Sequence, residues 1–295
     1  MLPPVVDAEW TTEHRAEVVL ADVRWYLDGR SGPEAYSRGH LPGALYIDLE
    51  RRLAGEGARG VGRHPLPSPA TFAFGMSTLG ISDESTVVAY DDQGGGIAAR
   101  LVWMLRATGH AAALLDGGLM AWDGPLEMGP PVVAPAAGTP PGLRRGKFTA
   151  RAWPKERLAQ VEDATAAANV VLDARELERY RGEVEPVDPR AGHIPGAWNL
   201  PWKGNLDRAG RFLAVEVLRR RFEAVGISEG TSVVSYCGSG ITACHNLLAR
   251  ELYGLGRGQL YPGSWSEYAA MYERPLETGD PHRAPVRADE PARRP

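Results

Sequence analysis

Hydrophobic residues follow two alternating patterns along the chain, short unbroken runs and stripes at helical spacing. The runs 86–90 and 231–236 are rich in β-branched residues and short enough to be buried strands. A helical stripe precedes each run: one over 68–80, with Ser68 and Pro69 as cap and first helical residue, and one over 215–226. Alternating strands and helices predict an α/β fold, a mostly parallel sheet flanked by helices on both faces.

The same motifs occur twice, in the same order. The segments 18–24, 39–44, 87–90 and 115–118 return as 170–175, 192–197, 233–236 and 261–263, at offsets between 145 and 153 residues. A chain of 295 residues is also long enough for two domains of ordinary size. We therefore predict two copies of one domain, at 1–124 and 146–278.

Proline-rich segments separate and follow the two copies. Residues 125–145 include six prolines among several glycines and alanines, a composition that predicts an extended linker. The tail 279–295 is rich in proline, arginine and acidic residues, so we expect it to be poorly ordered unless it docks.

One cysteine lies where a strand ends and a helix begins. Cys237 directly follows the run 231–236, and a helical pattern starts soon after it, near Ile241. In such a loop the unpaired N–H groups and the helix dipole both favour a thiolate. We therefore take Cys237 as a candidate nucleophile. Asp91 stands at the same place in the first copy and has no thiol, so that copy is expected to be catalytically silent.

Composition narrows the classes of function. A net charge of −4 and a pI near 6.0 argue against nucleic acid as a partner. No apolar run approaches the roughly 18–20 residues of a membrane helix, and the first residues do not resemble a secretory signal. Two cysteines cannot form a disulfide framework, which favours a reducing, cytoplasmic setting. We expect no cofactor, and no zinc site either, since Cys237, Cys244 and His245 lack the usual ligand spacing.

Taken together, these motifs resemble the tandem-domain rhodanese sulfurtransferases over residues 5–275. The Asp-x-Arg strand end, the Gly-His-Ile/Leu-Pro-Gly-Ala turn and the strand–Cys–loop–helix unit carry the resemblance. The loop 237–244 is similar to the active loop of 3-mercaptopyruvate sulfurtransferases. The resemblance implies that Cys237 takes a sulfane sulfur from 3-mercaptopyruvate or thiosulfate. The persulfide then passes sulfur to a thiophilic acceptor: cyanide, a thiol or a thioredoxin-like protein.

The family also implies roles for other residues. Ser239 matches the loop serine that works with a histidine and an aspartate, and His40 matches that histidine. Arg179 matches an arginine that grips the donor's anionic end. A second family arginine does not align cleanly, and Arg190 is the nearest candidate. The remaining expected substrate-binding residues are in the loop: Gly238, Gly240, Ile241 and Thr242.

Two other functions compete with this one. A rhodanese-fold phosphatase would need an arginine six residues after the cysteine, to hold the phosphoryl oxygens, but Ala243 stands there. A persulfide carrier without small-molecule turnover would use the same Cys237, so the sequence leaves it open. The donor, 3-mercaptopyruvate or thiosulfate, also stays open.

Overall fold

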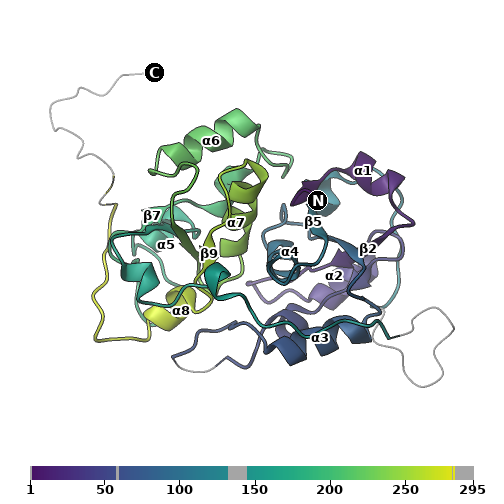
Figure 1. Ribbon diagram of the computed structural model, residues 1–295, viewed down its shortest axis with the longest axis horizontal. Coiled ribbons are helices and arrows are strands. Elements are labelled where there is room, and N and C mark those ends of the chain that lie inside the picture. Colours follow the sequence, from purple (N-terminus) through teal and green to yellow (C-terminus); the bar gives the residue numbers. More distant parts are fainter. Residues whose placement is uncertain (1, 58–59, 132–144, 281, 283–295) are drawn as a thin grey trace.

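The chain folds into two parallel sheets, one in each half, as Figure 1 shows. The computed structural model describes residues 2–57, 60–131, 145–280 and 282. The first sheet has the order β1-β5-β4-β2-β3, with β1 (Val5–Val6), β2 (Val18–Asp22), β3 (Leu45–Tyr46), β4 (Thr86–Tyr90) and β5 (Ala112–Leu115). The second has the order β7-β6-β8-β9, with β6 (Val170–Asp173), β7 (Trp198–Asn199), β8 (Val233–Tyr236) and β9 (Gln259–Leu260). The predicted α/β fold is confirmed.

Helices cover both sheets. The first half contains α1 (Ala8–Glu13), α2 (Gly32–Arg38), α3 (Pro69–Thr78) and α4 (Ala98–Ala107). The second contains α5 (Leu177–Tyr180), α6 (Val215–Glu223), α7 (Ala243–Leu252) and α8 (Ser264–Tyr268). The helical stripes read from the sequence correspond to α3 and α6. Ser68 caps α3 as expected, since its side chain accepts a hydrogen bond from the N–H of Thr71 at 3.0 Å.

Alternate residues of β4 belong to different hydrophobic clusters, which explains why the strand is apolar throughout. Val87 and Ala89 pack with residues of α3 and α4, whereas Val88 and Tyr90 pack on the other face with Leu41. The second sheet is covered in the same way, by α8 on one face and α6 on the other. A parallel sheet buried on both faces has this continuous hydrophobic pattern.

The two halves pack through the helices that follow the equivalent loops, and α4 and α7 lie next to each other at the centre of Figure 1. Trp103 and Met104 of α4 share one core with Leu247 and Leu248 of α7. The approach is close: a Cβ on Gly96 would come within 2.5 Å of the ring of Trp202. This contact needs a glycine at position 96, and it brings the segment before α4 against the second half.

The predicted linker and tail fall largely on residues whose structure is not described. Of the linker 125–145, only 125–131 and 145 are described, and of the tail only 279, 280 and 282. Within the described part of the chain, no helix has the length and apolarity to span a bilayer. The described residues also contain no group of three or more His, Cys, Asp or Glu that could hold a metal ion.

Candidate active site

Cys237 is the first residue after β8, at the carboxyl end of the sheet, and it is 2% exposed. The first turn of α8 fixes the backbone of its loop. The N–H groups of Trp265 and Ser266 donate to the carbonyls of Cys237 and Gly238, each at 2.9 Å. The N–H of Cys237 itself donates to Ser264 Oγ at 3.2 Å, so α8 holds this residue on both sides of its peptide unit. Cys237 and Cys244 are both free cysteines.

The equivalent loop of the first half shows what this backbone shape can hold. Asp91, which follows β4, is fully buried. Its carboxylate accepts four backbone N–H bonds at 2.8–2.9 Å, from Gln93, Gly95, Ile97 and Ala98. A strand, a tight loop and a helix N-terminus therefore form an anion cradle. In the first half a carboxylate fills that cradle, and in the second half the cysteine occupies the equivalent position.

A hydrogen-bonded chain of side chains reaches the Cys237 loop from the first half. Ser239 Oγ lies 2.7 Å from His64 Nδ1, and His64 Nε2 lies 3.0 Å from Glu50 Oε1. Because the carboxylate accepts the Nε2 proton, Nδ1 is left to accept from the serine hydroxyl. Burial lowers the pKa of His64, and Glu50 acts in the opposite direction. The neutral ring can therefore take a proton from Ser239.

The guanidinium groups of Arg63 and Arg179 lie next to the Cys237 loop. A Cβ added to Gly238 would lie 3.1 Å from Arg63 Nη2 and 3.5 Å from Arg179 Nη1. Asp188 joins the two, since it accepts from Arg63 Nη1 and, at 3.3 Å, from Arg179 Nη2. Both arginines line a cavity of about 290 Å³ next to Cys237, together with Ser239, Ile241 and Thr242. One side of this cavity belongs to the first half: Trp25, Leu27, Arg63, Gln93 and Ile97.

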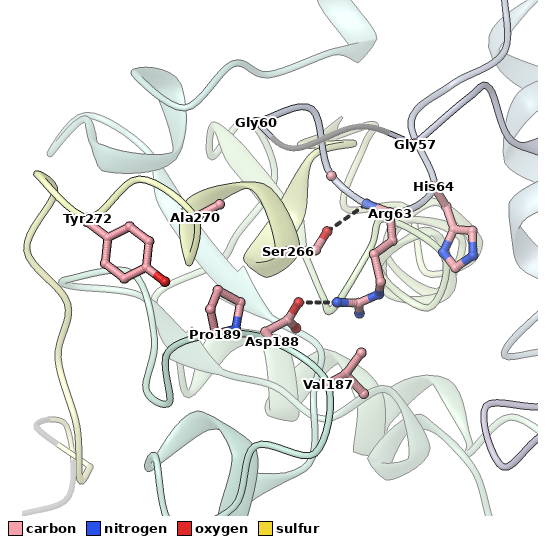
Figure 2. Close-up of a pocket in the computed structure, with 11 residues that line it drawn as sticks. Gly57, Gly60, Arg63, His64, Val187, Asp188, Pro189, Ser266, Ala270 and Tyr272 are labelled. Carbon is pink, nitrogen blue, oxygen red and sulfur yellow. Dashed lines mark hydrogen bonds and ion pairs between the residues drawn. The ribbon is translucent and has the colours of Figure 1, made fainter.

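Arg63 also lines a second and more open cavity of about 690 Å³, which Figure 2 shows. There its guanidinium points to Asp188, and its backbone N–H donates to Ser266 Oγ at 3.1 Å. The Arg63–Asp188 pair therefore stands between the two cavities. It ties the loop before α3 to the segment before β7.

The comparisons with known proteins agree with this geometry. A model of the rhodanese-like domain matches residues 7–124 and 155–271. The chain belongs to the rhodanese family. It is 43% identical over 282 residues to the probable 3-mercaptopyruvate sulfurtransferase of Pseudomonas aeruginosa, covering 90% of this chain and 93% of that one. It is 41% identical over 267 residues to a Mycobacterium tuberculosis protein named for thiosulfate sulfurtransferase activity, SseB, covering 89% and 91%.

A solved rhodanese structure is similar over the whole architecture. The 3-mercaptopyruvate sulfurtransferase of Leishmania major superposes with a TM-score of 0.80 at 30% identity, and the match covers 93% of this chain and 76% of that one. The tandem rhodanese arrangement expected from the repeated motifs is therefore confirmed.

The histidine that contacts Ser239 is His64, and the predicted partner His40 lies elsewhere. His40 lies in the turn before β3, where its Nδ1 is 2.9 Å from the carbonyl of Tyr36 and its ring stacks on that tyrosine. His193, in the second rhodanese repeat, makes the same contacts with Tyr180. Both histidines thus hold a turn common to the two copies. The contact with Ser239 belongs to His64, which the sequence analysis missed.

Arg190 does not supply the second guanidinium of the cavity. Its nitrogens donate to the backbone carbonyls of Tyr268, Ala269, Met271 and Arg274 at 2.7–2.9 Å, so it holds the end of α8. Arg63 stands beside Arg179 instead, and it was also missed. Both missed residues lie in the segment Gly62-Arg63-His64 before α3, and the corresponding segment before α6 reads Gly210-Arg211-Phe212, without a histidine.

The predicted loop residues divide into two groups. Gly238, Ile241 and Thr242 line the cavity with Ser239. Gly240 has a φ of 76°, and a Cβ there would come within 2.6 Å of the carbonyl oxygen of Pro262. Gly240 therefore shapes the loop, and it is not among the residues lining the cavity.

Proposed function

We propose that this rhodanese is a sulfurtransferase that receives a sulfane sulfur on Cys237 and passes it to a thiophilic acceptor. The observation that carries the proposal is the position of Cys237. It occupies the place that a buried carboxylate fills in the silent copy, at the floor of a cavity with two guanidinium groups. Such a place favours an anionic sulfur and an anionic donor.

In the first displacement sulfur moves from the donor to Cys237, and atoms and charge are conserved with either candidate donor. The Cys237 thiolate attacks the sulfur of 3-mercaptopyruvate, a Cys–S–S⁻ persulfide forms, and the C–S bond breaks. The carbon that leaves takes up the proton that the donor's thiol gives up, so pyruvate is released. With thiosulfate the S–S bond breaks and sulfite leaves with its electron pair, without any proton transfer. Both routes split a sulfur transfer into two displacements.

The second displacement restores the thiolate. An acceptor such as cyanide or a thiol attacks the outer sulfur of the persulfide, and the S–S bond breaks toward Cys237. A thioredoxin-like protein is a further proposed acceptor. We place this reaction in the cytoplasm, where thiol acceptors stay reduced.

The chain from Ser239 through His64 to Glu50 favours 3-mercaptopyruvate as the donor. Only that donor needs a proton moved from sulfur to carbon. The serine hydroxyl, 2.7 Å from a neutral imidazole, can accept the thiol proton as it gives its own to His64, and can return it to the leaving carbon. Arg179 and Arg63 are proposed to hold the donor carboxylate, because a guanidinium binds a planar carboxylate well.

Two measurements test the proposal on the full chain. The value of kcat/KM is compared for 3-mercaptopyruvate and thiosulfate with cyanide as acceptor, and a higher value for 3-mercaptopyruvate is expected. Cys237→Ser should abolish turnover with both donors, and retained turnover would refute the central role of Cys237. A protein that loads sulfur once and then stalls would instead be a persulfide carrier.

A further inference from the structure

Arg100 is a fully buried cation directly behind the Cys237 loop. It lies on α4 of the first half and is 0% exposed. Its guanidinium donates to the carbonyls of Gly240, His64 and Leu53, and among the described residues it has no carboxylate partner. Arg24 and Arg175, which are also buried, pair with Asp22 and Asp173. A guanidinium keeps its charge at neutral pH, and a buried charge without a carboxylate is costly.

The hydrogen bonds of Arg100 join the two halves of the site. Nη1 donates to the carbonyl of Gly240 at 2.8 Å, and Nη2 donates to the carbonyl of His64 at 2.9 Å. Gly240 follows Ser239 in the chain, and His64 is the partner of Ser239. The guanidinium of Arg100 therefore binds two backbone segments, one at Gly240 and one at His64. These are the segments that carry the Ser239–His64 hydrogen bond.

The repeat shows that this positive charge is specific to the cysteine-bearing loop. The offset that relates Asp91 to Cys237 also relates Gly94 to Gly240. In the silent loop the carbonyl of Gly94 is contacted by His245 of α7, with Nε2 at 3.2 Å. Burial lowers the pKa of His245 to about 3, so that ring is neutral. In the cysteine loop, the carbonyl of Gly240 therefore accepts from a cation on α4. In the aspartate loop, the equivalent carbonyl of Gly94 contacts a neutral ring on α7.

Two thiol groups lie close enough to Arg100 to affect its pKa. Burial lowers the pKa of the Arg100 guanidinium, whereas the neighbouring thiol groups of Cys244 and Cys237 act in the opposite direction. Burial also raises the pKa of Cys244 to about 12, so that thiol stays protonated at neutral pH. Cys237 is then the neighbour whose negative charge can compensate the arginine.

We propose that Arg100 is a positioning residue that stabilises anionic sulfur at Cys237, first the thiolate and then the persulfide. It does so through its charge and by fixing the loop at Gly240. The inference rests on the proposed function only in taking Cys237 as the sulfur carrier. It gives the silent copy an electrostatic role in addition to the contacts of His64 and Arg63.

The test measures alkylation of Cys237 by iodoacetamide, which needs no sulfur donor and so can succeed where donor turnover fails. Rates are measured on the full chain from pH 5 to 10, with mass spectrometry to assign the label to Cys237. Arg100→Met should lower the rate at neutral pH about tenfold and move the pH–rate curve up by about one unit, since tenfold corresponds to one pH unit. Other charged side chains that line the cavity, and that all variants retain, are Arg63, Arg175, Glu176, Arg179 and Lys203.

Arg250→Met is the matched control. Arg250 lies on α7, is 1% exposed and donates to the carbonyl of Thr231, so its loss removes an equally buried guanidinium. Its alkylation curve should coincide with that of the wild type. A folded Arg100→Met protein with the wild-type curve would overturn the proposal.

A second measurement applies if the neutral variants do not fold. The midpoints of thermal unfolding of the wild type and Cys237→Ser are compared from pH 6 to 9. A native state that favours the thiolate binds fewer protons than the unfolded chain, so the wild type should gain stability relative to the serine variant as pH rises. A relative loss of stability would mean that no charge stabilises sulfur at this position, and would overturn the proposal.

Discussion

Replacing His64 by asparagine should affect the two donors very differently. In the structure both ring nitrogens of His64 are hydrogen bonded, at 2.7 Å to Ser239 and 3.0 Å to Glu50, and the side chain is 7% exposed. An asparagine amide can still contact the serine hydroxyl, but it cannot take up a proton at neutral pH. His64→Asn therefore removes proton transfer while it keeps a polar group against Ser239.

The size of the effect follows from the role of the proton. General acid–base catalysis by a positioned side chain contributes typically about 10²–10⁴-fold, or about 3–5 kcal/mol in the activation free energy. We expect kcat/KM for 3-mercaptopyruvate to fall by about that factor in His64→Asn. Sulfite leaves thiosulfate without a proton, so kcat/KM for thiosulfate should change less than about fivefold.

The pH dependence of the ratio of the two kcat/KM values isolates His64. Both donors need the Cys237 thiolate, so its titration cancels in the ratio. Burial lowers the pKa of His64 from its ordinary value of 6.5, against the effect of Glu50, so the ring is neutral at pH 7 and above. The ratio of kcat/KM for 3-mercaptopyruvate to kcat/KM for thiosulfate should therefore not change at pH 7 and above in the wild type. It should decrease only at pH values below the ordinary histidine range, where His64 gains a proton and can no longer accept one.

His40→Asn is the control, because it also removes a buried imidazole from the first half, where His40 holds the carbonyl of Tyr36. It should lower thermal stability and leave the donor ratio unchanged. Equal losses for both donors in His64→Asn would show that His64 only supports the loop, and the proton-transfer reasoning would be refuted.

Three further predictions concern the cavity and the cradle. Arg63→Gln and Arg179→Gln should each raise KM for both anionic donors about 10–100-fold in steady-state assays, because charge-assisted bonds contribute about 1.5–3 kcal/mol. Arg190→Gln should lower the free energy of unfolding in urea by about 2–4 kcal/mol with KM unchanged, since its partners are backbone carbonyls. Asp91→Asn should lower the free energy of unfolding by about 3 kcal/mol in the same assay, because the new side-chain NH₂ group would face two backbone N–H donors.

The sequence was sufficient for features set by local pattern and repetition. The run ending at Tyr236, the cysteine after it and the following helix all appear where they were expected, because a strand–loop–helix unit is encoded within some twenty residues. The α/β fold followed from alternating periodicities. These features depend on neighbours in the chain, which a single sequence displays directly.

The contacts of Ser239 were not accessible in the same way. His64 is 175 positions away from Ser239 along the chain. The two meet because the halves pack closely, with α4 on α7 and Gly96 against the ring of Trp202. The residues around His64 form no local pattern that predicts which helix faces of the two copies pack together.

The repeat nevertheless contained a signal that separates structural from catalytic residues. A residue found at the same place in both copies serves what the copies share, which is the fold. His40 and His193 illustrate this, since both rings stack on a tyrosine with centroids 3.7 Å apart. A residue that acts on Cys237, which only the second copy has, must differ between the two copies. His64 corresponds to Phe212 in the second copy, and Arg100 corresponds to Asn246 there. On this reasoning we expect the first copy to support the Cys237 loop although Asp91 fills its own cradle, because two side chains that differ between the copies, His64 and Arg100, contact that loop.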